Sequence, residues 1–99
     1  METSVVVDGK KLFLNPFMSN LIGNILTATV RSLKSPEGER VEFNLRGDDL
    51  QLTIDEKEVP LNLGQARQIV GNVLKGVAAS LKGAENAREI QFSTKLTQS

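Results

Sequence analysis

Apolar and polar positions follow two periods along this chain, and each period indicates one kind of element. Apolar residues recur every three or four positions over 16–34 and again over about 62–82, which predicts two amphipathic helices. Shorter segments rich in β-branched or alternating apolar residues predict strands. These strand segments are 4–7, 11–14, 40–45, 50–55, 58–62 and 88–96.

Residues at the boundaries of the helices support the predicted starts and ends. Asn15 is placed to cap the first helix, and Pro16 fits its first position, where a missing N–H has no cost. Asn62 takes the same capping place before the second helix. Lys82 is expected in its last turn, and Gly83 just after it favours a left-handed cap.

Two short turns complete the expected hairpins. Asp8-Gly9 is a strong signal for a two-residue turn, because Gly accepts the positive φ that a type I′ turn demands. Glu56-Lys57 is expected to turn the second hairpin. The short "RGDD" segment predicts that the strands on either side of it pair as neighbours.

The two halves of the chain resemble each other in sequence. With two single-residue insertions, 13 of about 39 aligned positions are identical, where chance would give about two or three. The identical pairs include Asp8/Asp55, Asn15/Asn62, Gly23/Gly71, Asn24/Asn72 and Arg40/Arg88. The apolar stripes of the two helices also coincide in phase. This pattern predicts two copies of a strand–strand–helix–strand unit.

A duplicated unit also predicts the domain organisation. One unit of about 45 residues has too little core to stand alone, so two copies must complete each other. We expect one α+β domain over 1–99, built from a tandem ββαβ repeat at about 4–46 and 50–96. It should form a mostly antiparallel six-stranded sheet that carries the two helices. The sequence leaves open whether both helices share one face of the sheet.

Gly-Asn pairs occur at equivalent places in both helices. A glycine inside a helix costs about 0.5–1 kcal/mol relative to alanine, so Gly23 and Gly71 need a reason. Close packing of the backbone against a neighbouring element is the favoured interpretation, and it predicts that a large side chain at residue 71 is destabilising. The alternatives are a ligand or partner groove lined by Asn24 and Asn72, or inheritance of the glycines without a role.

Two arginines stand just before equivalent strands. Arg40 and Arg88 could form a two-fold pair of anion contacts, although solvated surface is the favoured interpretation. The acidic pairs Asp48-Asp49 and Asp55-Glu56 fall in turns, where turn geometry explains them better than catalysis or Ca²⁺ binding. The tripeptide Asn15-Pro16-Phe17 matches a short adaptor-binding motif, but its place at a helix start favours a structural role.

Composition excludes several functions and compartments. Twelve basic and twelve acidic residues balance, so no overall charge attracts nucleic acid or an anionic membrane. No apolar run approaches the about 20 residues of a membrane span. The start lacks the pattern of a signal peptide, and the absence of Cys is compatible with a reducing cytoplasm, where we expect the protein to act. Four Phe and no Tyr or Trp provide poor platforms for stacking bases.

The same composition argues against an enzyme. The chain has no His for proton transfer near neutral pH and no Cys nucleophile, and no Gly-rich phosphate loop lies between a strand and a helix. We therefore expect no catalytic residues, no metal and no cofactor. The chain should fold as a monomer, with at most a weak homodimer through exposed sheet edges.

The segments "VDGKKLFLNPF…SLKS…VEFNL" and "IDEKEVPLN…SLKG…REIQF" also carry a resemblance. Together they resemble a small module of archaeal and anaerobic bacterial proteins, found among appended domains that include those of molybdenum-cofactor biosynthesis proteins. The resemblance covers nearly the whole chain as two copies, and it departs where Asn62-Leu63-Gly64 replaces Asn15-Pro16-Phe17. It implies no catalytic residues and an accessory or binding role.

These observations lead to two hypotheses of function. The first is a non-catalytic interaction or accessory module that binds a protein partner through a sheet edge or the helical face. The second is a small-molecule or anion-binding domain that uses Asn24, Asn72, Arg40 and Arg88. A sheet face left uncovered and rich in exposed apolar groups would favour the first, and a concave pocket that contains both Asn side chains would favour the second.

Overall fold

Six strands and two helices make up the described part of the chain. A computed structural model describes residues 2–33, 38–47, 49–60, 65–84 and 86–96. The elements follow the order strand, strand, helix, strand, and then the same order again. They are β1 Thr3–Val7, β2 Lys10–Lys11, α1 Pro16–Ser32, β3 Arg40–Arg46, β4 Asp49–Ile54, β5 Lys57–Val59, α2 Gln65–Ala79 and β6 Glu89–Lys95.

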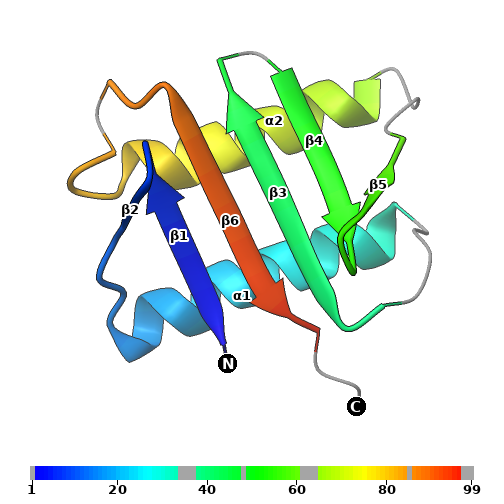
Figure 1. The fold of residues 1–99 in the computed structure, drawn as a ribbon, viewed down its shortest axis with the longest axis horizontal. Helices are drawn as coiled ribbons and strands as arrows, with labels where there is room; N and C mark the ends of the chain where they lie inside the picture. The colour runs from blue at the N-terminus through cyan, green and yellow to red at the C-terminus, as the bar shows by residue number, and fades with distance from the viewer. Residues whose placement is uncertain (1, 34–37, 48, 61–64, 85, 97–99) are drawn as a thin grey trace.

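One open sheet contains all six strands. Its order is β2-β1-β6-β3-β4-β5, and each neighbouring pair is antiparallel. The predicted α+β class with a six-stranded antiparallel sheet and two helices is therefore confirmed. Both helices lie on the same face of this sheet and run across its strands (Figure 1), which answers the question that the sequence left open.

The two central strands, β3 and β6, carry the middle of the core. Phe43 and Phe92 are directly opposite each other in this pair, and both side chains are 0% exposed. Alternate residues on β1 and β4, such as Val5 and Leu52, extend the same buried face toward the edges. From the helices, Leu26 and Leu74 complete the core against the sheet.

Residues that alternate with this core are mostly polar, Val6 being an apolar exception, and lie on the face away from the helices. Asn44 is directly opposite Gln91 on one side and Gln51 on the other. Two residues further along β6 on the same face, the hydroxyl of Ser93 forms a hydrogen bond of 2.7 Å with that of Ser4 on β1. An antiparallel sheet commonly has one buried and one solvated face, and this pattern is the reason that only one face is covered by helices.

Both hairpins turn on two residues with positive φ. Asp8 has φ 48° and Gly9 has φ 84°, which confirms the predicted Asp8-Gly9 turn. In the second hairpin the turn is Asp55-Glu56, with φ 51° and 68°. The prediction of Glu56-Lys57 is thus wrong by one residue, because Lys57 already pairs with Ile54 in the ladder.

The first residue of each turn also binds the start of a central strand. The carboxylate of Asp8 accepts hydrogen bonds from the backbone N–H groups of Arg88 and Glu89, at 3.0 and 2.9 Å. The carboxylate of Asp55 accepts from the N–H groups of Glu39 and Arg40, both at 3.0 Å. Each aspartate thus joins a hairpin turn to the beginning of β6 or β3.

Helix α1 begins as the sequence predicts and ends slightly earlier. Asn15 caps it, since its side chain accepts a 2.8 Å hydrogen bond from the N–H of Met18, and Pro16 occupies the first turn. The helix ends at Ser32 rather than at residue 34, and the N–H of Leu33 closes it on Thr29 and Val30. Residues 34–37 lie outside the described part of the chain.

Helix α2 ends three residues before the predicted boundary. At Ser80 and Leu81 the backbone hydrogen bonds change to the tighter i→i+3 type, so the helix stops at Ala79 and Lys82 lies beyond it. The left-handed conformation predicted for Gly83 is confirmed by its φ of 93°. Asn62, the predicted cap of this helix, lies outside the described residues.

The strand predicted over 11–14 is much shorter than expected. Only Lys10 and Lys11 pair with β1, after which the N–H of Leu12 makes one further bond to Val5. The chain must then leave the sheet edge to reach the cap at Asn15. A short edge strand with two lysines also limits pairing with other chains.

Replacing Glu56 with Gly should stabilise the protein. A non-glycine residue in the left-handed region is strained, and the first hairpin already has Gly9 at the corresponding place. We expect Glu56→Gly to raise the free energy of unfolding by about 0.5–1 kcal/mol, measured by urea denaturation. Gly9→Ala is the reciprocal variant and should lower it by a similar amount. An unchanged or lowered midpoint in Glu56→Gly would contradict the strain at this turn.

Removing either turn carboxylate should weaken the connection between hairpin and central strand. We expect Asp8→Ala and Asp55→Ala each to lower the free energy of unfolding by about 1–2 kcal/mol, because backbone donors lose a charged acceptor. Glu58→Ala removes an exposed carboxylate from β5 and should change it by less than about 0.5 kcal/mol. Equal effects of all three substitutions in urea denaturation would show that the hydrogen bonds are not the cause.

Candidate interaction groove

The two helices enclose an apolar groove on the outer side of the helix layer. Its cavity volume is about 520 Å³. No sheet residue lines it, so it opens away from the sheet. We call this surface the helix groove, and its lining residues are Phe17, Met18, Leu21, Ile22 and Ile25 from α1 together with Val73, Gly76, Val77, Ser80 and Leu81 from α2 and the turn after it.

The groove exists because each apolar stripe is wider than the side that contacts the sheet. On α1, Ile22, Leu26 and Val30 are buried against the strands. At 100° per residue, Leu21 and Ile25 lie to one side of that line, toward α2. A stripe that faces a core needs little more than 100° of the helix surface, and both stripes exceed this width.

Several large apolar side chains at or beside the groove are exposed. Phe17 is 71% exposed, Leu21 46%, Ile69 60% and Val73 43%. Single exposed apolar residues are common on protein surfaces, but these four share the outer side of two neighbouring helices. A contiguous patch of this kind is typical of an interaction site. The expectation that Phe17 is merely structural is therefore incomplete, since its neighbours Asn15 and Pro16 start the helix while its own ring faces outward.

The helices carry basic residues and no acidic ones. Arg31 is the charged residue of α1, and Arg67 and Lys75 are those of α2. The guanidinium of Arg67 forms an ion pair with the carboxylate of Asp49 on β4. Acidic residues of the described chain lie in the strands, turns and connections instead. The residues of the two helices thus carry more positive than negative charge, although the whole chain is neutral.

Asn24 and Asn72 do not meet in a shared pocket. Both side chains are exposed, one on each helix. Neither lines the helix groove, nor the cavities beside the β3–β4 turn and beside β5. The residues that line the helix groove are instead apolar neighbours such as Ile25 and Val73, and a binding role of the two amides stays a prediction.

Arg40 and Arg88 also lie apart. Arg40 is opposite Lys95 at the start of β3, whereas Arg88 precedes Glu89 at the start of β6. Since β3 and β6 are antiparallel and seven residues long, their starts are at opposite ends of the sheet, about 20 Å apart. A single anion therefore cannot contact both arginines, and separate anion contacts at the two positions stay a prediction.

The sequence alignment that matches Arg40 with Arg88 is also displaced by one residue relative to the structure. At the start of β6, the carboxylate of Asp8 binds the backbone N–H groups of Arg88 and Glu89. At the start of β3, the carboxylate of Asp55 binds those of Glu39 and Arg40. By this geometry the counterpart of Arg40 is Glu89 rather than Arg88. The identity of the two arginines therefore does not reflect a shared position in the fold.

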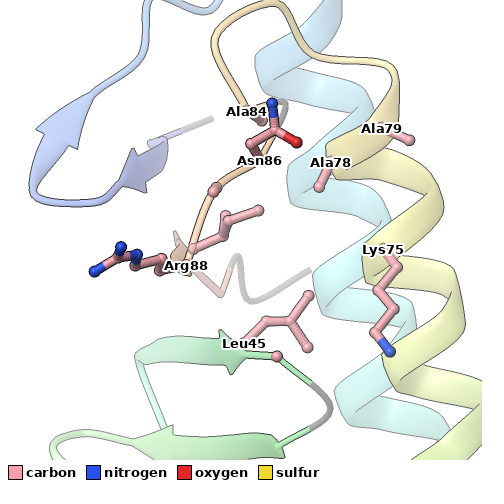
Figure 2. Close-up of a pocket in the computed structure, with 10 residues that line it drawn as sticks. Leu45, Lys75, Ala78, Ala79, Ala84, Asn86 and Arg88 are labelled. Atoms are coloured by element: carbon pink, nitrogen blue, oxygen red, sulfur yellow. The ribbon is translucent and has the colours of Figure 1, made fainter.

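A second cavity, of about 390 Å³, lies between α2 and the segment that leads into β6. Lys75 and Arg88 both line it, so it could appear to be an anion site. Figure 2 shows that the charged ends of these two side chains extend in opposite directions rather than toward one point. Most of the other lining side chains, including Ala78 and Ala84, are apolar, and Asn86 is the exception. This geometry does not hold a small anion.

The helix glycines are buried, but one of them has room beside it. Gly23 and Gly71 are both buried. A Cβ built on Gly71 would meet no described atom within 4 Å outside its neighbours and its own helix backbone. The predicted tight contact at Gly71 is therefore wrong, and this glycine is not required by packing.

The shortest ion pair that links the central strands is on the surface. The Nη2 of Arg46 donates to Oε2 of Glu89 at 2.6 Å, across the β3–β6 register. This hydrogen bond and the attraction of the carboxylate raise the pKa of the Arg46 guanidinium above its ordinary value. Arginine is protonated at any physiological pH in either case, so the pair fixes two strand ends rather than a catalytic proton.

Among the residues that the structure describes, no three carboxylates lie together in a way that could hold a metal ion. Neither described helix is both long enough and apolar enough to cross a bilayer. Comparison with known proteins finds no matching family, no matching curated protein and no matching solved structure.

Substituting Gly71 with Ala should stabilise the protein rather than strain it. The added methyl group enters open space, and alanine favours the helix by about 0.5–1 kcal/mol. Urea denaturation should show a free energy of unfolding raised by that amount. A destabilised Gly71→Ala variant would mean that the helix axis is held closer to its surroundings than the structure indicates.

Proposed function

We propose that this chain is a non-catalytic interaction module whose partner-binding surface is the helix groove. The observation that carries the proposal is the apolar lining of the groove, with Phe17, Leu21 and Val73 exposed at its edges. Interaction sites in soluble proteins are distinguished by such contiguous apolar patches. The groove lining also lacks the groups that catalysis needs.

Ser80 is the single polar side chain among the lining residues of the described groove. Its hydroxyl donates a 3.2 Å hydrogen bond to the backbone carbonyl of Gly76. No acid or base lines the groove to activate that hydroxyl, and the chain has no His or Cys. These facts support binding over turnover.

We also propose that the module arose by duplication of one strand–strand–helix–strand unit. The strand order supports this, because exchanging β1 with β4, β2 with β5 and β3 with β6 leaves it unchanged when read from the other edge. Phe43 and Phe92, which the sequence alignment matches, are paired at the centre of the sheet. Asp8 and Asp55, also matched, make the same two kinds of backbone contact.

Affinity capture from a lysate of the source organism tests the interaction function. We expect specific proteins to bind the immobilised chain and to be lost with Val73→Asp, which places a charge at the groove. Gln68→Asp adds the same charge to an exposed position of α2 outside the groove lining, and it should retain them. Mass spectrometry identifies the captured proteins. Absence of any protein captured above the background of blank resin would contradict the proposed function.

A further inference from the structure

The outward side of the two described helices carries almost no charge. The chain has twelve basic and twelve acidic residues, yet α1 and α2 together contain only Arg31, Arg67 and Lys75. Arg67 is paired with Asp49, while Arg31 and Lys75 already take part in interactions within the chain. A helix side that faces water usually carries charged residues, whereas the centre of a protein interface is depleted of them. The outward side therefore has the composition of an interface.

Equivalent positions on this side have the same chemistry in both helices. Leu26 and Leu74, which the alignment matches, point into the core and are 0% and 1% exposed. Counting 100° per residue from these two leucines places the same set of positions away from the sheet or toward the groove in each helix. We call the residues that match in chemistry at these positions the outer helix face. Its pairs are Asn20/Gln68, Leu21/Ile69, Asn24/Asn72, Ile25/Val73, Ala28/Gly76 and Ser32/Ser80.

Packing on the sheet does not explain this match. All residues of the outer helix face except the half-buried Ile25 are exposed, so the core does not select them. Duplication alone would explain identical residues, but four of the six pairs differ in identity and share only their chemical class. The pairs on this side that differ in class are Phe17/Gln65 and Arg31/Ala79. The outer helix face thus has an approximate two-fold symmetry, in agreement with the symmetric strand order.

A second copy of the chain matches both the chemistry and the symmetry of the outer helix face. An interface around a two-fold axis sets one patch against the same patch of the other copy, so the patch must be complementary to itself. Amides both donate and accept hydrogen bonds, and aliphatic side chains pack against one another. A face with unpaired cations would repel its own copy, whereas the outer helix face contains no charged residue.

The helix side of the molecule is large enough for a dimer contact. The two longer extents of the molecule are 31 and 30 Å, and both helices lie across the face that these extents define (Figure 1). A face of this size provides up to about 800 Å², the share of one partner in a standard interface. The exposed apolar area of Phe17, Leu21, Ile69 and Val73 is on the order of 400 Å². About half of the contact is then apolar, as in non-obligate interfaces, so a reversible dimer is expected.

Resting on the proposed interaction function, we propose that two copies of this chain pair reversibly through their outer helix faces. Leu21, Ile69 and Val73 of each copy pack against the aliphatic residues of the other, and the helix groove closes within the contact. The amides of Asn24 and Asn72 form hydrogen bonds across it. Four helices then form an inner layer between two sheets, whose polar faces and edges stay in water. This contact differs from the weak dimer through sheet edges that the sequence suggests.

Sedimentation equilibrium of the full chain and of three variants tests this proposal. Ile69→Asp and Leu21→Asp place a carboxylate on the outer helix face, one on each helix. Gln51→Asp is the matched control, because it adds the same charge to an exposed position on the polar face of the sheet. The fold of each variant is checked by circular dichroism. A concentration series of ¹H–¹⁵N NMR spectra of the unmodified chain maps the contact surface.

We expect the unmodified chain to change from monomer to dimer between about 1 and 500 µM, as a small reversible interface does. Ile69→Asp and Leu21→Asp should each raise the dimer Kd at least about tenfold, because a carboxylate becomes buried without a partner. Gln51→Asp should change it by less than about twofold, since its charge stays in water far from the contact. Amide shifts that depend on concentration should lie in 20–32 and 68–80. This map needs no substitution, so it decides the question even where a variant fails to fold.

Other outcomes would overturn the proposal. If the chain stays monomeric over the whole range while proteins from the lysate are still captured and lost with Val73→Asp, the interaction function stands and the second copy is excluded. A dimer that Ile69→Asp and Leu21→Asp leave intact, but that Lys11→Pro at the edge strand β2 dissolves, would assign the contact to the sheet edge. Concentration-dependent shifts confined to the strands would likewise exclude the outer helix face. Monomers that bind phosphatidylglycerol vesicles, with binding lost in Ile69→Asp, would assign this face to a lipid.

Discussion

The pairing of β3 with β6 is the interaction on which the other elements depend. Each of these strands lies between the hairpin and the central strand of the other half, since β6 lies between β1 and β3, and β3 lies between β6 and β4. Neither half can therefore complete its sheet without the third strand of the other. Phe43 and Phe92, opposite each other and fully buried, place two of the largest core side chains at this junction. Without these two central strands only the hairpins β1–β2 and β4–β5 would remain, and a two-stranded hairpin is marginally stable at best in water.

The turn aspartates fix where each central strand begins. A carboxylate that accepts from two successive N–H groups defines a register, because a shift by one residue would break both bonds and move every core side chain to the solvated face. At both sites the aspartate also has positive φ and donates its own N–H to the strand that it caps, Asp8 to Glu89 and Asp55 to Arg40. Asp tolerates this conformation better than most residues, which is a local reason for its presence at both turns.

Sequence patterns could predict the elements because their signals are local. The cap at Asn15, the Asp8-Gly9 turn and the alternation in β3 each depend on neighbours in the chain, and all three are confirmed. The second turn was misplaced because Glu56 occupies a position with φ 68° that usually signals glycine. The length of β2 was overestimated because the chain must leave the sheet edge after Lys11 to reach the start of α1. This requirement comes from the tertiary structure and not from neighbouring residues in the sequence.

The candidate site was harder to predict from the sequence, because its position depends on the angle at which each helix meets the sheet. Leu21, Ile25 and Val73 belong to the predicted stripes, but a stripe does not say which of its members face the strands. The alignment of Arg40 with Arg88 misled for a related reason: identity along the chain ignored a one-residue displacement that only the Asp8 and Asp55 contacts reveal. Gly71 was misleading too, since a helix glycine signals a close contact only when a neighbour is near.

The groove follows from the proportions of the sheet and its cover. Both helices cross the strands on one face (Figure 1), so the strand length sets the space that they must cover. Central strands of seven residues are about 23 Å long, whereas two helices with their side chains measure about 10–12 Å each. Two helices are thus just wide enough to cover the core. The residues of α1 and α2 that face each other then leave a concave surface between the helices, and the apolar character of that surface comes from stripes wider than the sheet requires.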